Sequence, residues 1–253
     1  MIARTTILIY GLISYALAVA SLGYAILFVG NVGVSPSLDT VRQTDPWSAL
    51  LIDLGLLAAF AIQHSVMARP AFKRLWTRVV PAAAERSTYV LASGLLLGAL
   101  VYFWQPLGGV LWQFEAEAAI VALYALFAMG WALVLVSTFQ IDHFDLFGLR
   151  QVWLHFRGEA YRPRGFVKPF LYRYVRHPLY VGLLIGIWAA PTMTVAHLVF
   201  AAMCTAYIAI GTRLEERDLE AALPEYAEYK KAVPMFLPSA ERKPAVEGAP
   251  VNA

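Results

Sequence analysis

Residues 118–138 read AAIVALYALFAMGWALVLVST, a run of 21 residues that contains no charged side chain. At about 1.5 Å of rise per residue, a helix of this length spans roughly 30 Å, the thickness of the hydrocarbon core of a bilayer. Water-soluble proteins need polar residues to cover their surface, so an uncharged run of this length indicates a lipid environment. The run therefore predicts a transmembrane helix.

Similar apolar runs occupy most of the chain. Three of them precede the quoted stretch, at residues 7–29, 48–67 and 88–104. A longer apolar region, residues 179–214, is interrupted by Pro191. Because proline cannot continue a helix interior, this region predicts a tight helical hairpin with a short first arm. We therefore expect an all-α integral membrane protein with about six transmembrane segments, including this C-terminal hairpin.

The composition supports the same conclusion. Hydrophobic residues make up 60% of the 253 residues and charged residues 15%, which excludes both a soluble globule and a disordered chain. A net charge of +3 would suggest nucleic-acid binding in a soluble protein, but here Lys and Arg lie in short stretches between apolar runs. We expect the lipid bilayer and a small molecule as partners, with no nucleic acid and no obligate protein partner. The single cysteine, Cys204, excludes an intramolecular disulfide.

The basic residues predict the orientation. Apart from Arg42, every Lys and Arg lies at the N-terminus, in residues 68–87, in residues 139–176 or beyond Thr212. Cytoplasmic loops of membrane proteins are enriched in Lys and Arg, so we expect these segments in the cytoplasm. The protein is then a multi-pass protein of the inner (cytoplasmic) membrane. Tryptophans favour membrane interfaces, and three are expected at the outer one: Trp47, Trp104 and Trp112.

Polar side chains gather at the predicted inner boundary of the membrane. His64 closes the second apolar run, and His143 follows the fourth between Asp142 and Asp145. An imidazole accepts protons near neutral pH and a carboxylate can orient it, so these four residues are candidate catalytic groups facing the cytoplasm. The alternative for each is structural: a histidine bonded at a helix end, or an aspartate in a turn or cap. No two histidines are three or four residues apart, so we predict no metal site.

A second polar segment joins a basic loop to the predicted hairpin. Residues 172–182 read YRYVRHPLYVG. Pro178 sits where a helix is expected to begin, which leaves the amides of the first helical turn free to face an anionic group. Arg176 and His177 beside these amides suit a ligand carboxylate. The segment is therefore a candidate ligand-binding site.

The chain beyond the hairpin supplies complementary groups. Glu215 and Glu216 are adjacent at the predicted membrane exit. Their carboxylates can accept hydrogen bonds from an ammonium group or from ribose hydroxyls. Tyr226, Tyr229 and Pro234 follow, and such side chains can pack against the face of an adenine ring. The alternative is a solvated helix beside the membrane.

This C-terminal pattern resembles a known family. The sequence RHPLYVG at residues 176–182, the Glu215–Glu216 pair and the later tyrosines are similar to the cofactor motif of isoprenylcysteine carboxyl methyltransferases and related membrane methyltransferases. The resemblance covers roughly the last third of the chain. It implies that S-adenosyl-L-methionine binds there, and it adds Tyr180 to the expected binding residues.

The N-terminal motifs narrow the resemblance. QHSVMAR at residues 63–69, ERSTY at residues 85–89 and HFDLFGLRQV at residues 143–152 resemble the NnrU-like branch of these membrane proteins. Within that branch the likeness is to enzymes that methylate methanethiol. The resemblance implies a thiol S-methyltransferase that makes dimethyl sulfide. Such a reaction needs a group that takes the thiol proton, and the ordinary pKa of histidine makes His64 or His143 the expected base.

Three other functions stay open at this stage. One is methylation of a lipid-linked or isoprenoid cysteine, and a second is an NADPH-dependent sterol reductase. The third is an NnrU-like accessory or transport protein without enzymatic activity. We expect one polytopic membrane domain over residues 1–238, with the scaffold and substrate side in 1–171 and the cofactor-binding hairpin and C-terminal segment in 172–238. Residues 239–253 are rich in proline without apolar periodicity and predict a disordered tail.

Overall fold

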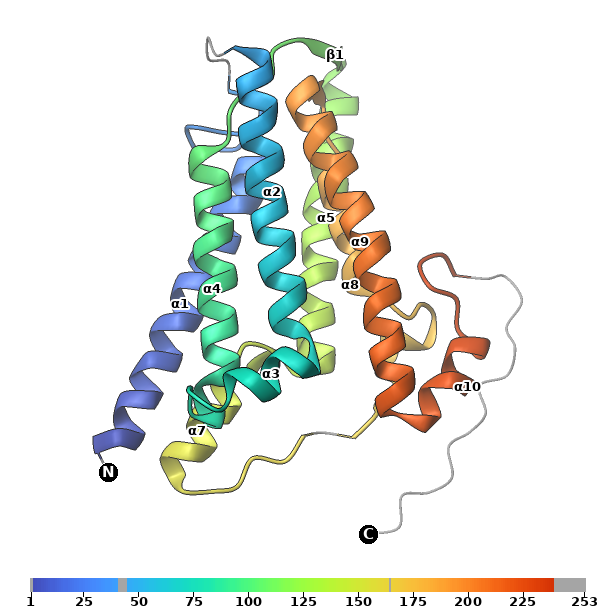
Figure 1. The fold of residues 1–253 in the computed structure, drawn as a ribbon. Coiled ribbons are helices and arrows are strands. Elements are labelled where there is room, and N and C mark those ends of the chain that lie inside the picture. The colour runs from blue at the N-terminus through green and yellow to red at the C-terminus, as the bar shows by residue number, and fades with distance from the viewer. Residues whose placement is uncertain (1, 41–44, 164, 239–253) are drawn as a thin grey trace.

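The computed structural model describes residues 2–40, 45–163 and 165–238, and it is a bundle of long helices with shorter helices gathered at one end (Figure 1). The predicted tail at 239–253 and Arg42 lie outside these residues. Within them, five helices are long and apolar enough to cross a membrane: α1 (Ile2–Gly30), α2 (Pro46–Ala68), α4 (Ala82–Phe103), α5 (Glu117–Ile141) and α9 (Val195–Ala222). The predicted all-α membrane fold is confirmed.

Local chemistry explains where these helices begin. The Asp45 carboxylate accepts a hydrogen bond from the Ser48 amide at 2.8 Å, and Pro46 occupies the first turn of α2. Thr194 caps α9 in the same way, because its hydroxyl accepts the His197 amide at 3.1 Å. These caps satisfy amides that have no partner within the helix.

The sixth predicted segment is only partly helical. The helix α8 (Pro178–Trp188) has 11 residues, so it rises about 16 Å, roughly half of the hydrocarbon thickness. The chain then becomes extended and forms β2 (Thr192–Thr194), which pairs antiparallel with β1 (Val110–Gln113). The predicted hairpin of α8 and α9 is present, but its turn is a strand that the sequence did not predict. Pairing with β1 satisfies backbone groups that an interrupted membrane segment otherwise leaves without partners.

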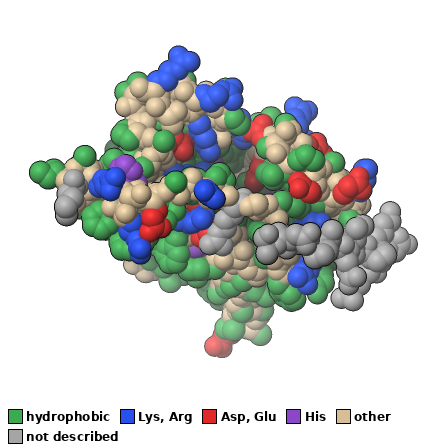
Figure 2. Space-filling model, turned by 90° about the horizontal axis from the view of Figure 1, so that it is seen from below, with side chains coloured by type: hydrophobic (Ala, Val, Ile, Leu, Met, Phe, Trp, Pro, Cys, Tyr) green, Lys and Arg blue, Asp and Glu red, His purple; other side chains and the backbone are tan. Residues whose placement is uncertain are grey.

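The two ends of the bundle differ in character. The sheet lies at one end, and α3 (Pro70–Trp76), α7 (Leu149–Arg157) and α10 (Pro224–Ala232) lie at the other, together with the start of α1 (Figure 1). Figure 2 looks onto this second end and shows Lys and Arg side chains distributed over it. The bundle therefore collects the basic segments on one side, as the predicted topology requires.

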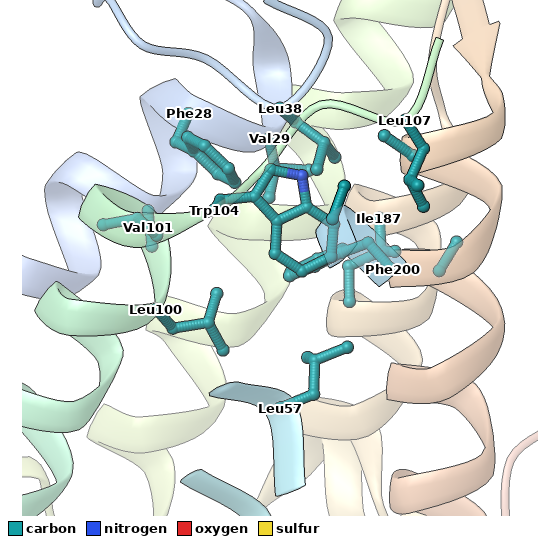
Figure 3. Close-up of a cluster of buried hydrophobic side chains, with 14 residues drawn as sticks. Phe28, Val29, Leu38, Leu57, Leu100, Val101, Trp104, Leu107, Ile187 and Phe200 are labelled. Carbon is teal, nitrogen blue, oxygen red and sulfur yellow. The ribbon is translucent and has the colours of Figure 1, made fainter. Parts of the chain in front are cut away.

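The main hydrophobic core lies near the sheet end (Figure 3). Trp104 is 2% exposed, and its ring meets Phe28 and Phe200 edge to face at centroid distances of 6.4 and 5.5 Å. Trp104 therefore faces the protein core. The chain leaves α4 at this residue and the indole turns inward, where burial of its large apolar surface stabilises the fold. Trp47 and Trp112 are exposed, and the position of all three tryptophans at a membrane interface stays a prediction.

Glycines bring α5 and α8 into backbone contact. A Cβ atom added to Gly130 would lie 2.6 Å from the Gly186 nitrogen and 2.8 Å from the Gly182 oxygen. No side chain larger than hydrogen fits at such a position, and small residues are what allow membrane helices to approach so closely. This contact fixes α8, and with it the RHP sequence at its start, against the long helix α5.

Candidate active site

One buried carboxylate organises the C-terminal motif. Glu216 on α9 is 2% exposed, and its Oε1 atom accepts hydrogen bonds from Arg176 Nε at 2.7 Å and His177 Nε2 at 3.0 Å. The Lys230 ammonium on α10 lies 3.3 Å from Oε2. A buried charge is tolerated when it is paired and hydrogen-bonded, as it is here. The structure thus brings together residues that lie 40 positions apart in the sequence.

Arg176 also attaches the segment after α10. Its guanidinium donates to the backbone oxygens of Lys230, at 3.0 Å, and of Val233. The Arg176 amide donates to the Pro234 oxygen at 2.9 Å, and the His177 amide donates to the Met235 oxygen at 3.2 Å. The contact that the structure gives Pro234 is therefore this backbone bond, which closes the C-terminal segment over the start of α8.

Tyr226 and Tyr229 form a buried aromatic group with Phe166. The ring centroids of Phe166 lie 5.9 Å from Tyr226 and 5.3 Å from Tyr229. Burial raises the pKa of both phenols, so both stay protonated at neutral pH. Tyr229 donates to the Tyr172 oxygen at 2.6 Å, whereas the Tyr226 hydroxyl is buried and has no hydrogen-bond partner among the described residues. A buried polar atom without a partner is costly, which makes this hydroxyl a candidate contact for a ligand.

Tyr180 and Glu215 form the next pair along the motif. The Tyr180 hydroxyl on α8 donates to Glu215 Oε2 on α9 at 2.9 Å, and the Tyr180 ring stacks on His177 at 5.5 Å. Pro178 between them is buried at the first position of α8, as predicted. The nine predicted cofactor residues therefore lie at the start of α8 and just before it, in the C-terminal part of α9, and in the segment from α10 to Pro234.

His64 lies in a polar group on α2 and α4. Its ring stacks on Phe60 at a centroid distance of 5.3 Å. Nδ1 lies 3.2 Å from the Ser93 oxygen, and Nε2 lies 2.9 Å from the Tyr89 oxygen. The structural alternative considered above, a histidine bonded to a backbone carbonyl, does not describe these contacts, which are with hydroxyl groups.

His143, at the start of the short helix α6 (His143–Leu146), has similar partners. Nε2 lies 2.9 Å from the Tyr15 oxygen and Nδ1 lies 2.9 Å from the Thr138 oxygen. The ring stacks on Phe139 at 4.3 Å and is 37° from parallel with Phe147 at 4.7 Å. Burial lowers the pKa of His143, and the charge of Asp142 opposes this shift only in part. The imidazole is therefore neutral at neutral pH.

The structure gives the two aspartates other partners. Asp142 caps α6, because its side chain accepts the Asp145 amide at 3.2 Å. The Asp145 carboxylate accepts hydrogen bonds from Arg150 at 3.2 Å and from the Tyr161 hydroxyl at 3.2 Å. Hydroxyl groups occupy both ring nitrogens of His143, so the expected orientation of this imidazole by Asp142 or Asp145 is not what the structure contains.

Comparison with known proteins identifies the family. The chain is 49% identical over 243 residues to methanethiol S-methyltransferase of Crocosphaera subtropica. The aligned residues make up 96% of this chain and 95% of that protein. This chain is 48% identical over 236 residues to methanethiol S-methyltransferase of Mycobacterium tuberculosis, covering 93% and 97%. The chain belongs to the methanethiol S-methyltransferase family. Nurim of Rattus norvegicus is 34% identical over 181 residues, 68% of each chain. No family model and no solved structure matches.

Membership of the methanethiol S-methyltransferase family confirms the family that the motifs predicted. The similarity extends over more than nine tenths of the chain, well beyond the last third that carried the cofactor pattern. Family membership assigns no role to individual residues, so the catalytic and cofactor residues named above stay predictions.

Sequence reasoning missed several polar residues that connect the His64 group on α2 and α4 with the cofactor motif on α8 and α9. The Ser65 and Tyr207 hydroxyls lie 3.2 Å apart and join α2 to α9, and the Arg69–Asp218 ion pair at 2.8 Å joins the same helices. Tyr89 on α4 is close enough to Glu215 and Tyr180 to interact with them electrostatically. Tyr89 begins the apolar run at residues 88–104, where a tyrosine is ordinary, so nothing in the sequence signals these contacts.

Proposed function

We propose that this protein transfers a methyl group from S-adenosyl-L-methionine to methanethiol and releases dimethyl sulfide. The names of its relatives support the acceptor and the reaction. The structural observation that carries the proposal is the contact between α2 and α9. The Ser65–Tyr207 hydrogen bond and the Arg69–Asp218 ion pair bring the end of α2 that holds His64 beside the part of α9 that holds Glu215. A base and a ligand-binding motif therefore belong to the same site.

The residues present fit the methyl donor. S-adenosyl-L-methionine carries an ammonium group, a carboxylate, ribose hydroxyls and an adenine ring. Glu215 suits the ammonium group or the ribose, and Tyr226 offers a buried hydroxyl without a partner among the described residues. When bound, the donor supplies a methyl group on a positively charged sulfur.

The remaining motif residues have a supporting role in this proposal. The Glu216 carboxylate is already bonded to Arg176 and His177 and lies beside Lys230. We assign Glu216 and Arg176 to the frame that holds α8, α9 and the C-terminal segment together. Direct contacts with the donor belong to Glu215, Tyr180, Tyr226 and the first turn of α8 after Pro178.

We assign the base to His64 rather than to His143. A thiol with a pKa of roughly 8.5 or above is mostly protonated at neutral pH, so methyl transfer requires a group that takes its proton. His64 lies on the end of α2 that contacts α9 through Ser65 and Tyr207, whereas His143 is held among Phe139, Phe144 and Phe147. Methanethiol is small and apolar, so it can reach such a site by partitioning from the bilayer.

A headspace assay tests this function. Detergent-purified protein supplied with S-adenosyl-L-methionine and methanethiol should release dimethyl sulfide, and it should bind S-adenosylhomocysteine in calorimetry. A farnesyl-cysteine analogue, offered to the same preparation, tests the lipid-linked alternative. Methylation of that analogue without any dimethyl sulfide would contradict the small-thiol acceptor, and an absence of S-adenosylhomocysteine binding would contradict a methyltransferase.

The cofactor assignment gives a prediction at Glu215. Glu215→Gln should weaken S-adenosylhomocysteine binding by about 1.5–3 kcal/mol, because it removes the charge from one hydrogen bond, and this corresponds to roughly 10- to 150-fold in affinity. Isothermal titration calorimetry measures the change. Glu220→Gln on the same helix is the matched control, since Glu220 pairs with Lys230 and is 37% exposed. Equal affinities of the two variants would place the ammonium group elsewhere.

The orientation gives a second prediction. In a Cys204→Ala background, a cysteine replacing the exposed Gly108 should react with a membrane-impermeant maleimide in intact cells. A cysteine replacing Arg157, exposed at the opposite end of the bundle, should react only after the membrane is permeabilised. This result is expected because the basic end faces the cytoplasm. Labelling of Arg157→Cys in intact cells would reverse the proposed orientation of the site.

A further inference from the structure

The hydrogen bonds around His64 define which ring nitrogen carries the proton. The Ser93 hydroxyl donates to Gln63 Oε1 at 3.3 Å, so the Ser93 oxygen is the acceptor for Nδ1–H of His64 at 3.2 Å. In a neutral imidazole the other nitrogen, Nε2, then carries a lone pair. The Tyr89 oxygen lies 2.9 Å from Nε2 and 3.0 Å from Nδ1; since Nδ1 carries the proton, the Tyr89 hydroxyl can donate only to Nε2.

This arrangement separates the basic nitrogen from any substrate. The Tyr89 hydroxyl lies within 3.0 Å of both ring nitrogens of His64, and Phe60 stacks on one face of the ring. The Ser65–Tyr207 hydrogen bond and the Arg69–Asp218 ion pair hold this end of α2 against the part of α9 that carries Glu215, and Tyr89 interacts electrostatically with Glu215 and Tyr180. A thiol bound beside the methyl donor would therefore meet the Tyr89 hydroxyl before it meets the imidazole.

Resting on the proposed function, we propose that Tyr89 is a catalytic residue that relays the thiol proton to His64. The S–H bond of methanethiol breaks and its proton joins the Tyr89 oxygen, while the proton already on that oxygen moves to Nε2 of His64. The electron pair of the S–H bond stays on sulfur and forms the new bond to the transferred methyl carbon. The pair of the broken carbon–sulfur bond stays with the donor sulfur, which becomes a neutral thioether.

The charges balance across this step. The sulfonium loses its positive charge, dimethyl sulfide is neutral, and the one proton released is held by His64 as imidazolium until it passes to solvent after product release. Tyr89 begins and ends as a neutral phenol. Its oxygen carries transient negative character only while the two protons move.

Arg86 is placed to stabilise that transient charge. Its guanidinium carbon lies 4.9 Å from the centre of the Tyr89 ring, and its Nε donates to the Leu146 oxygen at 2.7 Å, which fixes the side chain. A fixed positive charge over an aromatic ring attracts electron density and favours negative charge on the phenol oxygen. Arg86 and Tyr89 both come from the ERSTY sequence at the start of α4.

A second tyrosine–histidine pair, Tyr15 and His143, has similar hydrogen bonds but is not part of the proposed relay. Thr138 donates to the Leu135 oxygen at 2.7 Å, so its oxygen accepts Nδ1–H of His143, and Tyr15 donates to Nε2 of His143. The Tyr15 ring packs edge to face on Phe147 at 5.7 Å. Its helix α1 lies on the opposite side of the bundle from α9 in Figure 1. Among the described residues, no hydrogen bond or ring contact joins Tyr15 or His143 to a residue of the cofactor motif.

The test compares Tyr89→Phe with Tyr15→Phe, because each substitution removes one hydroxyl from one histidine Nε2 and keeps the ring. Tyr89→Phe should lower kcat for methanethiol at least 100-fold at neutral pH, whereas Tyr15→Phe should stay within about threefold of wild type. Affinity for S-adenosylhomocysteine should stay within about twofold in both. The residual activity of Tyr89→Phe should rise about tenfold per pH unit, because solvent then supplies the thiolate.

A second acceptor makes the test specific for proton transfer. Methaneselenol is nearly the same size as methanethiol but is a much stronger acid, so it is ionised at neutral pH and needs no relay. The loss caused by Tyr89→Phe should shrink to less than about tenfold with methaneselenol. An equal loss with both acceptors, or no loss with methanethiol, would overturn the relay. A wild-type protein that makes no dimethyl sulfide would instead contradict the proposed function itself.

Discussion

Glu216→Ala should lower the free energy of unfolding by about 3–5 kcal/mol, because it leaves a buried guanidinium without its counter-charge. Glu216 is 2% exposed and accepts hydrogen bonds from both Arg176 and His177. The loss is expected to exceed any effect on cofactor contacts, since the carboxylate holds three segments of the chain together. Denaturant titration of the protein in detergent micelles measures it.

Two further variants test whether the loss of stability comes from the unpaired Arg176 guanidinium or from any substitution in this part of α9. Glu220→Ala, one turn further along α9, removes a half-exposed partner of Lys230 and should cost less than about 1 kcal/mol. The double variant Glu216→Leu with Arg176→Met removes both buried charges and should recover part of the stability. A loss at Glu216 no larger than that at Glu220 would show that the cluster does not support the fold.

The residues of this cluster could be paired from sequence because the motif is ordered. Arg176 and His177 precede the hairpin, and Glu215 and Glu216 end it, so a hairpin whose second arm runs back beside the first returns the acidic pair toward the basic one. The membrane spans were predictable for a similar reason: uncharged runs of sufficient length have few other environments. Both features depend on composition and order along the chain rather than on detailed packing.

Other features depend on contacts that no local pattern encodes. The strands at Val110 and Thr192 are four and three residues long, too short for a visible alternation, and they pair across more than 75 residues. Trp104 follows α4 at a boundary where tryptophan favours the interface, but Phe28 and Phe200 from two other helices enclose it. Asp145 lies beside His143 in sequence, yet Arg150 and Tyr161 compete for its carboxylate.

The role proposed for Tyr89 in the candidate site is another feature that the sequence alone does not predict. A lone tyrosine in an apolar run is more often a packing residue than a catalytic one, so its spacing gives no signal. Its significance comes from its hydrogen bond with His64 on α2 and from its electrostatic interaction with Tyr180 and Glu215 on the hairpin. The sequence supplied the histidine and the cofactor motif, while the link between them required the packing of α2 and α4 against α9.

His64→Ala should lower turnover of methanethiol by about 10²- to 10⁴-fold at neutral pH, the range expected for loss of a general base. Affinity for S-adenosylhomocysteine should stay close to that of wild type, because the lost interaction belongs to proton transfer and not to donor binding. Activity should recover in part at high pH or with added imidazole, either of which supplies a substitute base. Headspace measurement of dimethyl sulfide across pH gives the profile.

His143→Ala is the comparison that decides between the two histidines. It removes a ring that Tyr15 and Thr138 bond and that Phe139 stacks on, so it should lower stability while the turnover of each folded molecule changes less than about threefold. The folded fraction, measured by calorimetric titration of binding sites, corrects the observed rate. If the corrected rate falls with His143→Ala and not with His64→Ala, the base is His143, and the proton route through Tyr89 is wrong as well. The two histidines share the same hydrogen bonds, so their positions relative to Glu215 determine which of them acts as the base.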